Sequence, residues 1–246
     1  MSAAMIDRLR FLLLQVRNSD DPMRQHEIEC FARAMGVGAE QITVHDLLSG
    51  APDQSVVDKS DAFLFGGSGH YSAAGEGEWL ERALDVLRDL HAKQRPTFAS
   101  CWGCQAMARA MGGQVIHDAE RAELGTHRLT LTEAGKGDSL LGPLGNSFSA
   151  QMGHEDRVVT LPPDATLLAS SELVEVQAYH FNNLPIYCTQ FHPELKRQDI
   201  VDRVTAYPEY VQHISRLTLD EFCDSLQETP ECEQILRRFV QLIDDM

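Results

Sequence analysis

The sequence predicts an α/β fold with a mostly parallel, doubly wound sheet and antiparallel additions. Apolar, strand-like runs alternate with helix-like segments through the first half of the chain, which is the rhythm of βαβ units. The first run is almost continuously apolar, as expected for a parallel strand covered on both faces. From about residue 114 to 189, short β-like runs are separated by Gly, Pro, Asn and Asp, which predicts the antiparallel strands.

The first strand and helix have clear boundaries. Residues 10–16 form the first apolar run. Asp21 and Pro22 then give an N-cap followed by proline at the first helical position, and Gly36 closes the helix. Between these boundaries apolar residues recur at helical spacing: Ile28, Phe31, Ala32 and Met35.

Three strands and two helices continue the alternation. Residues 41–45 and 61–65 predict the second and third strands. A long helix follows, and its apolar stripe consists of Trp79, Leu80, Ala83, Leu84, Leu87 and Leu90. Residues 96–100 predict the fourth strand, and residues 103–111 predict the helix behind it.

The second half supplies the added strands and a helical end. The expected antiparallel strands, joined to the same sheet, are residues 127–131, 157–161, 174–179 and 186–190. After Pro193 the chain is helical again: Thr218 and Glu221 fit a capping box, and Thr229 before Pro230 starts the last helix. One face of that helix carries Ile235, Leu236, Phe239, Leu242 and Ile243.

The chain is predicted to form a single domain. Its 246 residues contain no internal repeat, linker or low-complexity segment. We therefore expect one domain over residues 1–246, with a core at about 10–195 and a helical C-terminal extension at about 197–246.

Charge and composition exclude several classes of protein. With 21 Lys and Arg against 37 Asp and Glu, the net charge is −16, which argues against a nucleic-acid groove because basic residues neutralise phosphates there. No segment approaches the ~20 apolar residues that span a bilayer, and the apolar run near the start is too short for a signal peptide. We expect a cytoplasmic protein that binds neither nucleic acid nor membrane. Six cysteines without an export signal predict no disulfide framework.

The most informative segment surrounds Cys101, which lies where a predicted strand meets a predicted helix. Such a turn exposes a nucleophile above the sheet edge, and the helix N-terminus favours the thiolate. Gly103 permits close approach of the next turn. The amide of Trp102, which follows the cysteine, is a candidate oxyanion donor.

A second segment provides partners for a cysteine nucleophile. His192 and Glu194 follow the last predicted strand, and in an extended chain residues two apart point the same way. A nucleophilic cysteine needs a base, and the base needs an orienting carboxylate. His192 and Glu194 supply both groups.

A third segment places Gly66 and Gly67 directly after the third strand. Neither the Lys-Ser/Thr ending of a phosphate loop nor the dinucleotide-binding spacing is present. The functional interpretation is that the exposed amide of Gly67 completes an oxyanion hole.

Two other chemistries fit part of the cysteine motif. Cys101 and Cys104 have the Cys-x-x-Cys spacing of a thioredoxin-type redox pair, which would leave the histidine and glycine motifs unexplained. A zinc site would need a second ligand pair, and His180 and His192 do not have that spacing.

Together the motifs resemble those of a class I (triad-type) glutamine amidotransferase. They are Cys-x-Gly-x-Gln at 101–105, Phe-His-Pro-Glu at 191–194 and Gly-Gly at 66–67. The chain is most similar to stand-alone members like the amidotransferase domain of GMP synthase, over about residues 10–195. The resemblance implies a flavodoxin-like architecture and hydrolysis of the glutamine side-chain amide to glutamate and ammonia, with no cofactor or metal.

The resemblance also implies roles for individual residues. Cys101 is then the nucleophile, His192 the general base and Glu194 the residue that orients it. The oxyanion hole is then formed by the amides of Gly67 and Trp102.

The resemblance further implies a substrate-binding set. Gln105 is expected near the bound glutamine, and His154 and Asp156 are expected to help hold its α-amino and carboxylate groups. Two positions depart from the family pattern: Ala99 stands where glycine is usual, and Ser68 stands where many relatives have proline. Both changes affect local geometry and neither removes a reacting group.

Three functions remain open for a small-molecule substrate. The first is a glutaminase that delivers ammonia to a synthase in another chain, because this chain has no room for one. The second is a γ-glutamyl peptidase or hydrolase, because the same triad serves γ-glutamyl amides and peptides. The third is a non-catalytic regulatory module, which the intact triad disfavours. The loop residues His70, Tyr71 and Ser72 are candidates for lining a leaving-group pocket.

Overall fold

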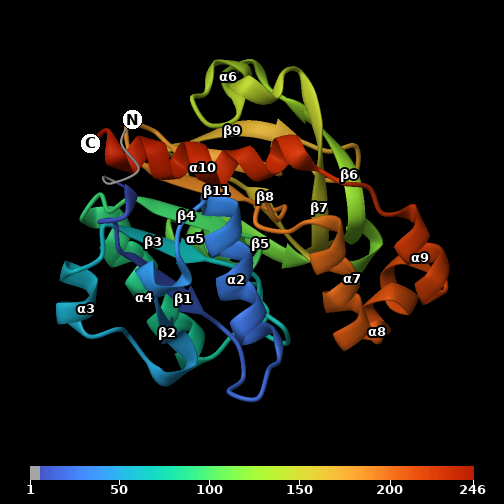
Figure 1. Cartoon of the computed structure of the whole chain (residues 1–246), viewed down its shortest axis with the longest axis horizontal. Helices are drawn as coiled ribbons and strands as arrows, with labels where there is room; N and C mark the ends of the chain where they lie inside the picture. The colour runs from blue at the N-terminus through green and yellow to red at the C-terminus, as the bar shows by residue number, and fades with distance from the viewer. Residues whose placement is uncertain (1–5) are drawn as a thin grey trace.

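The computed structural model describes residues 6–246 and is built around a nine-stranded sheet (Figure 1). Its strands are β1 (Phe11–Gln15), β2 (Ile42–Asp46), β3 (Ala62–Phe65), β4 (Thr97–Ser100), β6 (Glu123–Leu131), β7 (Ser147–His154), β9 (Ala165–Ser170), β10 (Ala178–Phe181) and β11 (Ile186–Thr189). Their order is β2-β1-β3-β4-β11-β10-β9-β6-β7. A separate two-stranded sheet pairs β5 (Gln114–His117) with β8 (Asp156–Thr160).

The sheet has a parallel half and an antiparallel half, as the sequence predicts. Strands β2, β1, β3, β4 and β11 are parallel neighbours. Strands β10, β9, β6 and β7 extend the sheet with antiparallel pairs. Within the parallel half, β4 is fully buried and lies between β3 and β11.

Three of the four strands expected in the second half differ from the prediction. The run at 186–190 gives the buried strand β11, which is antiparallel to β10 as predicted but parallel to β4 on its other side. The run at 157–161 gives β8, which leaves the main sheet and pairs with β5. The run at 174–179 becomes a strand only from Ala178, because the Val174 carbonyl accepts a turn hydrogen bond from the Ser171 amide at 2.9 Å. The apolar content of a segment predicts that it is buried, but it predicts neither the direction of the strand nor its neighbour in the sheet.

Helices cover both faces of the parallel half (Figure 1). The helices are α2 (Met23–Met35), α3 (Gln54–Asp58), α4 (Glu78–Ala92), α5 (Trp102–Ala110), α6 (Glu133–Gly137), α7 (Arg197–Ala206), α8 (Pro208–Tyr210), α9 (Leu219–Ser225) and α10 (Pro230–Asp244). Along β1, Phe11 and Leu13 pack with α2 and α10, whereas Leu12 and Leu14 pack with α4 and α5. Within residues 6–246, no helix has the length and apolar character needed to cross a membrane.

The predicted helix boundaries follow from local hydrogen bonds. Helix α2 begins one residue later than predicted, with Pro22 and not Asp21 at the N-cap, although the Asp21 carboxylate accepts from the Met23 amide at 2.7 Å. Gly36 ends α2 at φ +73°, as predicted. Thr218 and Glu221 form the expected capping box at the start of α9. Short side chains that can accept from free amides thus mark where these helices begin.

The helical extension has two parts with different positions. Helices α7, α8 and α9 gather at one end of the molecule, and α10 returns along the sheet beside α2 (Figure 1). The Phe239 ring lies 5.4 Å from the Phe98 ring of β4 and 6.4 Å from the Tyr187 ring of β11, measured between centroids. Helix α10 is therefore a covering layer of the central sheet.

We predict that Phe239→Ala lowers the free energy of unfolding by about 3–5 kcal/mol, because it leaves a cavity beneath the two central strands. Urea denaturation followed by circular dichroism measures the change. Gln234→Ala, on the exposed face of the same helix, is the control and should change it by less than about 0.5 kcal/mol. Equal stabilities for the two variants would contradict a core role for α10.

Candidate active site

Cys101 occupies a strained turn between β4 and α5. Its backbone has φ +52° and ψ −108°, a conformation that residues with a side chain rarely adopt and that costs about 1–3 kcal/mol. The thiol points toward the Gly153 carbonyl oxygen at 3.6 Å. The predicted strand-to-helix location of this cysteine is confirmed.

Close packing on both sides holds the turn in place. The Cys101 amide donates to the Thr189 carbonyl of β11 at 2.8 Å, and the Gly103 amide donates to the Gly66 carbonyl at 3.1 Å. A Cβ at position 103 would lie only 2.4 Å from the Cβ of Phe65, so glycine is required there. The absent side chain lets α5 start directly against β3.

His192 and Glu194 form a buried pair beside this turn. Their side chains approach to 2.6 Å between Nδ1 and Oε1, and both residues are almost fully buried. His192 is positioned through its backbone amide, which donates to the Gln151 carbonyl of β7 at 2.9 Å. The pair therefore depends on both β11 and the antiparallel half of the sheet.

The charges of this pair stabilise each other. Burial alone would lower the pKa of His192, but the carboxylate of Glu194 and the contact with Cys101 outweigh burial and raise it to about 9. Burial alone would raise the pKa of Glu194, but His192, and after it Arg203, lower it. At neutral pH the pair is therefore an imidazolium and a carboxylate, with a proton available next to the thiol.

Gly67 and Trp102 provide two free amides near the thiol. Neither backbone N–H takes part in the hydrogen bonds found among residues 6–246. A Cβ at Gly67 would lie 3.1 Å from Cε1 of His192 and 3.7 Å from the Cys101 sulfur, so this loop borders both side chains. The amides are thus available to an oxygen atom bound beside Cys101.

Two cavities meet at Cys101. We call the first, of about 310 Å³, the polar cavity; it is lined by Ser68, Gly69, His70, Tyr71, Ser72, Cys101, Trp102, Gln105, His117, Gly153, His154, Glu155, Asp156 and Tyr210. It contains the three residues predicted to bind substrate, together with the loop proposed for a leaving group.

The predicted substrate-binding side chains are held by other groups of the protein. Gln105 donates to the Asp156 carbonyl oxygen at 2.8 Å. His154 uses both ring nitrogens, one with the Glu123 carboxylate at 3.0 Å and one with the Asp156 carbonyl at 3.1 Å. The Asp156 carboxylate accepts from the Ser72 hydroxyl at 2.5 Å and contacts His117. The structure brings these residues to one wall, and their contact with substrate stays a prediction.

The second cavity, which we call the tail cavity, has a volume of about 90 Å³. It is lined by Arg17, Met23, Gly67, Ser68, Gly69, Cys101, Leu124, Met152, Gly153, His192, Leu195, Ile200, Arg203, Val204, Tyr207 and Tyr210. Helices α7 and α8 form one of its walls. His192 lines this cavity and is not among the residues that line the polar cavity.

A buried charge network connects the tail to the glycine loop at 66–69. The Arg17 guanidinium contacts the fully buried Glu27 carboxylate at 3.3 Å and Asp21 at 3.1 Å. Asp21 also accepts from the Tyr207 hydroxyl at 2.5 Å, and the Tyr210 hydroxyl donates to the Gly69 carbonyl at 3.0 Å. These hydroxyls fix α8 against the loop that borders Cys101.

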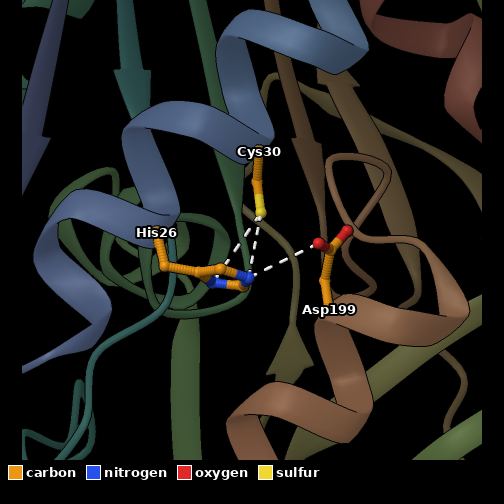
Figure 2. Close-up of side chains that lie close together, drawn as sticks. All are labelled: His26, Cys30 and Asp199. Carbon is orange, nitrogen blue, oxygen red and sulfur yellow. Dashed lines mark hydrogen bonds and ion pairs between the residues drawn. The ribbon is translucent and has the colours of Figure 1, made fainter.

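A cluster of His26, Cys30 and Asp199 fastens α7 to α2 (Figure 2). His26 lies 3.4 Å from the Asp199 carboxylate and 3.6 Å from the Cys30 sulfur. Their donor atoms all lie within 4.8 Å of one another, close enough to share a metal ion. However, Asp199 is already paired with Arg33 and the Lys196 amide, and burial raises the pKa of Cys30 to about 12. We interpret the cluster as an ion-paired junction between helices.

Sequence reasoning missed the contribution of the tail to this site. Arg203, Tyr207 and Tyr210 carry no motif that distinguishes them from other residues of a polar helical end. Arg17 could have indicated a buried charge network, because a charged residue just after a buried strand needs either a partner of opposite charge or solvent. Its partner Glu27 lies on the helix that follows.

Comparison with known proteins shows the family of the chain. The family "Glutamine amidotransferase class-I" matches residues 32–202. Gamma-glutamyl peptidase 3 of Arabidopsis thaliana is 30% identical over 213 residues, which cover 83% of this chain and 81% of the relative. The chain belongs to the class I glutamine amidotransferase family. A subunit of the glutamine-hydrolysing GMP synthase of Sulfolobus acidocaldarius is 36% identical over 150 residues, covering 60% of this chain and 76% of that protein.

Solved structures share the amidotransferase fold. A glutamine amidotransferase from Thermotoga maritima superposes with a TM-score of 0.77 at 17% identity, covering 96% of this chain and 99% of that one. A GMP synthase subunit from Thermoplasma acidophilum gives 0.67 at 22% identity, covering 96% and 95%. The predicted α/β fold class is confirmed.

We predict that Glu194→Gln lowers the pKa of His192 from about 9 toward its ordinary value of 6.5. The carboxylate is the main group that favours the protonated imidazole, and burial, which disfavours it, remains in the variant. A heteronuclear NMR titration of labelled histidine measures the change. Glu228→Gln, an exposed substitution in the tail, should leave the His192 titration in place; a shift of equal size there would rule out Glu194 as the cause.

Proposed function

We propose that this protein hydrolyses γ-glutamyl amide bonds through a thioester on Cys101, with glutamine as the simplest substrate. The observation that carries the proposal is the strained position of Cys101 beside the buried His192–Glu194 pair. Membership in the class I glutamine amidotransferase family supports a hydrolase-type enzyme. The convergence of a nucleophile, a proton carrier and an orienting carboxylate disfavours a non-catalytic module.

The proposed reaction begins with acyl transfer. The Cys101 sulfur attacks the side-chain amide carbon as a thiolate whose proton is already on His192. A C–S bond forms, and the amides of Gly67 and Trp102 hold the developing oxyanion. His192 gives its proton to the nitrogen as the C–N bond breaks, and ammonia leaves. The carboxylate of Glu194 keeps the imidazole oriented and protonated for this step.

The second half of the proposed reaction releases glutamate. His192, now neutral, removes a proton from a water molecule that attacks the thioester carbon. The C–S bond breaks, and glutamate and the free cysteine are released. The glutamyl half occupies the polar cavity, beside Gln105, His154 and Asp156.

Ammonia delivery to a synthase is the second candidate function. It is supported by the similarity to a GMP synthase subunit, which is by name one part of a larger enzyme. In that case a synthase partner would increase the rate of glutamine hydrolysis. A rate on glutamine that does not change when a synthase is added would favour a free-standing hydrolase.

We predict that Cys101→Ala lowers glutamate release at least ~10⁴-fold, because the variant has no nucleophile. Release from glutamine and from γ-glutamyl dipeptides is measured by chromatography. Cys104→Ala is the matched control, since burial raises the pKa of that thiol well above its ordinary value and keeps it neutral. Activity that survives in Cys101→Ala would disprove the proposal, and activity lost in Cys104→Ala would point to a dithiol mechanism.

We also predict that Gly67→Ala lowers kcat/KM by about 10²-fold or more. The new methyl group would lie 3.1 Å from His192 and displaces either the imidazole or the oxyanion donor. Steady-state kinetics on glutamine measures the loss. Gly137→Ala is the control, because a Cβ there meets no atom within 4 Å and should leave the rate unchanged.

A further inference from the structure

Only one of the two cavities at Cys101 is lined by His192, the residue that supplies the proton in the proposed reaction. His192 lines the tail cavity, whereas Gln105, His154 and Asp156 line the polar cavity. In the proposed reaction His192 protonates the nitrogen that leaves. The leaving group must therefore be on the side of the tail cavity. The glutamyl half is then on the other side, beside His70, Tyr71 and Ser72, which the sequence had suggested for the leaving group.

The tail cavity is larger than ammonia requires. Its volume of about 90 Å³ compares with the ~10–15 Å³ that a cavity needs to hold one water molecule. Its walls are partly apolar, with Met23, Ile200 and Val204 among them. Ammonia would leave most of this space unused, whereas an amino acid with a small side chain would fill it.

Arg203 brings an unpaired positive charge to this cavity. Its Nε and Nη2 atoms are buried and have no hydrogen-bond partner among residues 6–246. Arg17, the other arginine in the wall, is by contrast paired with Glu27 and Asp21. Arg203 is half-buried, and leaving two buried guanidinium nitrogens without partners is unfavourable. A carboxylate is the group that the planar guanidinium binds best.

We propose that the tail cavity is a leaving-group subsite for an α-amino acid, and that Arg203 binds its carboxylate. This inference rests on the proposed function. The scissile bond joins the γ-carbonyl carbon to the amino nitrogen of that amino acid. When it breaks, the acyl group stays on the Cys101 sulfur, His192 supplies the proton to the nitrogen, and the amino acid leaves with its carboxylate on Arg203.

Helices α7 and α8 hold the wall of the subsite in a fixed position. Arg203 lies on α7, which is fastened to α2 by the contact of Asp199 with His26 (Figure 2) and by its ion pair with Arg33. Tyr207 and Tyr210, which follow Arg203, attach α8 to Asp21 and the glycine loop. The wall that carries the unpaired charge is therefore fixed relative to the nucleophile.

A purely structural role for Arg203 makes a different prediction. Its charge also lowers the pKa of Glu194, so it could act on the reaction only through the His192–Glu194 pair. In that case its loss would slow every substrate by the same factor. A carboxylate-binding role instead changes the preference between two substrates that differ only in that carboxylate.

The test compares γ-glutamylglycine with γ-glutamylglycinamide, which lacks the terminal carboxylate. We expect the full-length protein to prefer the free acid by tenfold or more in kcat/KM, as for one charged hydrogen-bonded pair. Arg203→Gln should bring the ratio of the two rates close to one, and Arg203→Lys should give an intermediate ratio. Arg197→Gln removes a positive charge at the start of the same helix, where the side chain binds tail carbonyls, and should keep the original ratio.

Several outcomes would overturn the subsite. A ratio near one in the unsubstituted protein would do so without any variant, as would a ratio that Arg203→Gln leaves unchanged. An equal fall in kcat/KM for both substrates and for glutamine would mean that Arg203 acts only through Glu194. If glutamine is hydrolysed in a Cys101-dependent way and neither γ-glutamyl substrate is, the subsite fails and the proposed function stands. If none of the three is hydrolysed, both fail.

Discussion

The backbone at Cys101 is the constraint on which the rest of the site depends. A positive φ at a residue with a side chain is unfavourable, so the surrounding structure must hold it. The central position of β4 supplies that support, because β11 binds the Cys101 amide on one side and α5 packs against β3 on the other. The same two neighbours carry the other reacting groups: the loop after β3 holds Gly67, and the segment after β11 holds His192. The parallel sheet thus strains the nucleophile and delivers its partners at one edge.

The part of the fold that could be predicted is the part set by local sequence. The apolar runs, capping residues and the glycine at position 36 located the parallel strands and their helices within a residue or two. The cysteine and histidine motifs were found for the same reason, since each lies directly after a strand. The parallel pairing of β11 with β4 and the separate pairing of β8 with β5 were not predicted, because alternation and apolar content do not say which strand lies alongside. Likewise, nothing in the stripe of α10 shows that it covers β4 and not another surface.

The role of the C-terminal tail is the feature of the structure that the sequence predicted least. Its helices were expected as an extension with no assigned role, yet they supply a wall of the site, a layer of the core and the anchors of the glycine loop. Two of the residues responsible, Tyr207 and Tyr210, bind partners that lie far earlier in the chain. The contact between Tyr207 and Asp21 depends on the path of the backbone in three dimensions, so it cannot be predicted from a local sequence pattern.

The neighbouring positions of β4 and β11 also have a consequence for how activity is acquired during folding. The strands that carry Cys101 and His192 are adjacent in the sheet, and the antiparallel half is inserted between them in sequence. Closing such a long loop costs chain entropy that is recovered only when the parallel pair forms, which makes this pairing a late and slow step. Until it forms, the cysteine lacks both its strained turn and its imidazolium. In a partly folded chain Cys101 and His192 are therefore apart, and hydrolysis becomes available only after most of the sheet is complete.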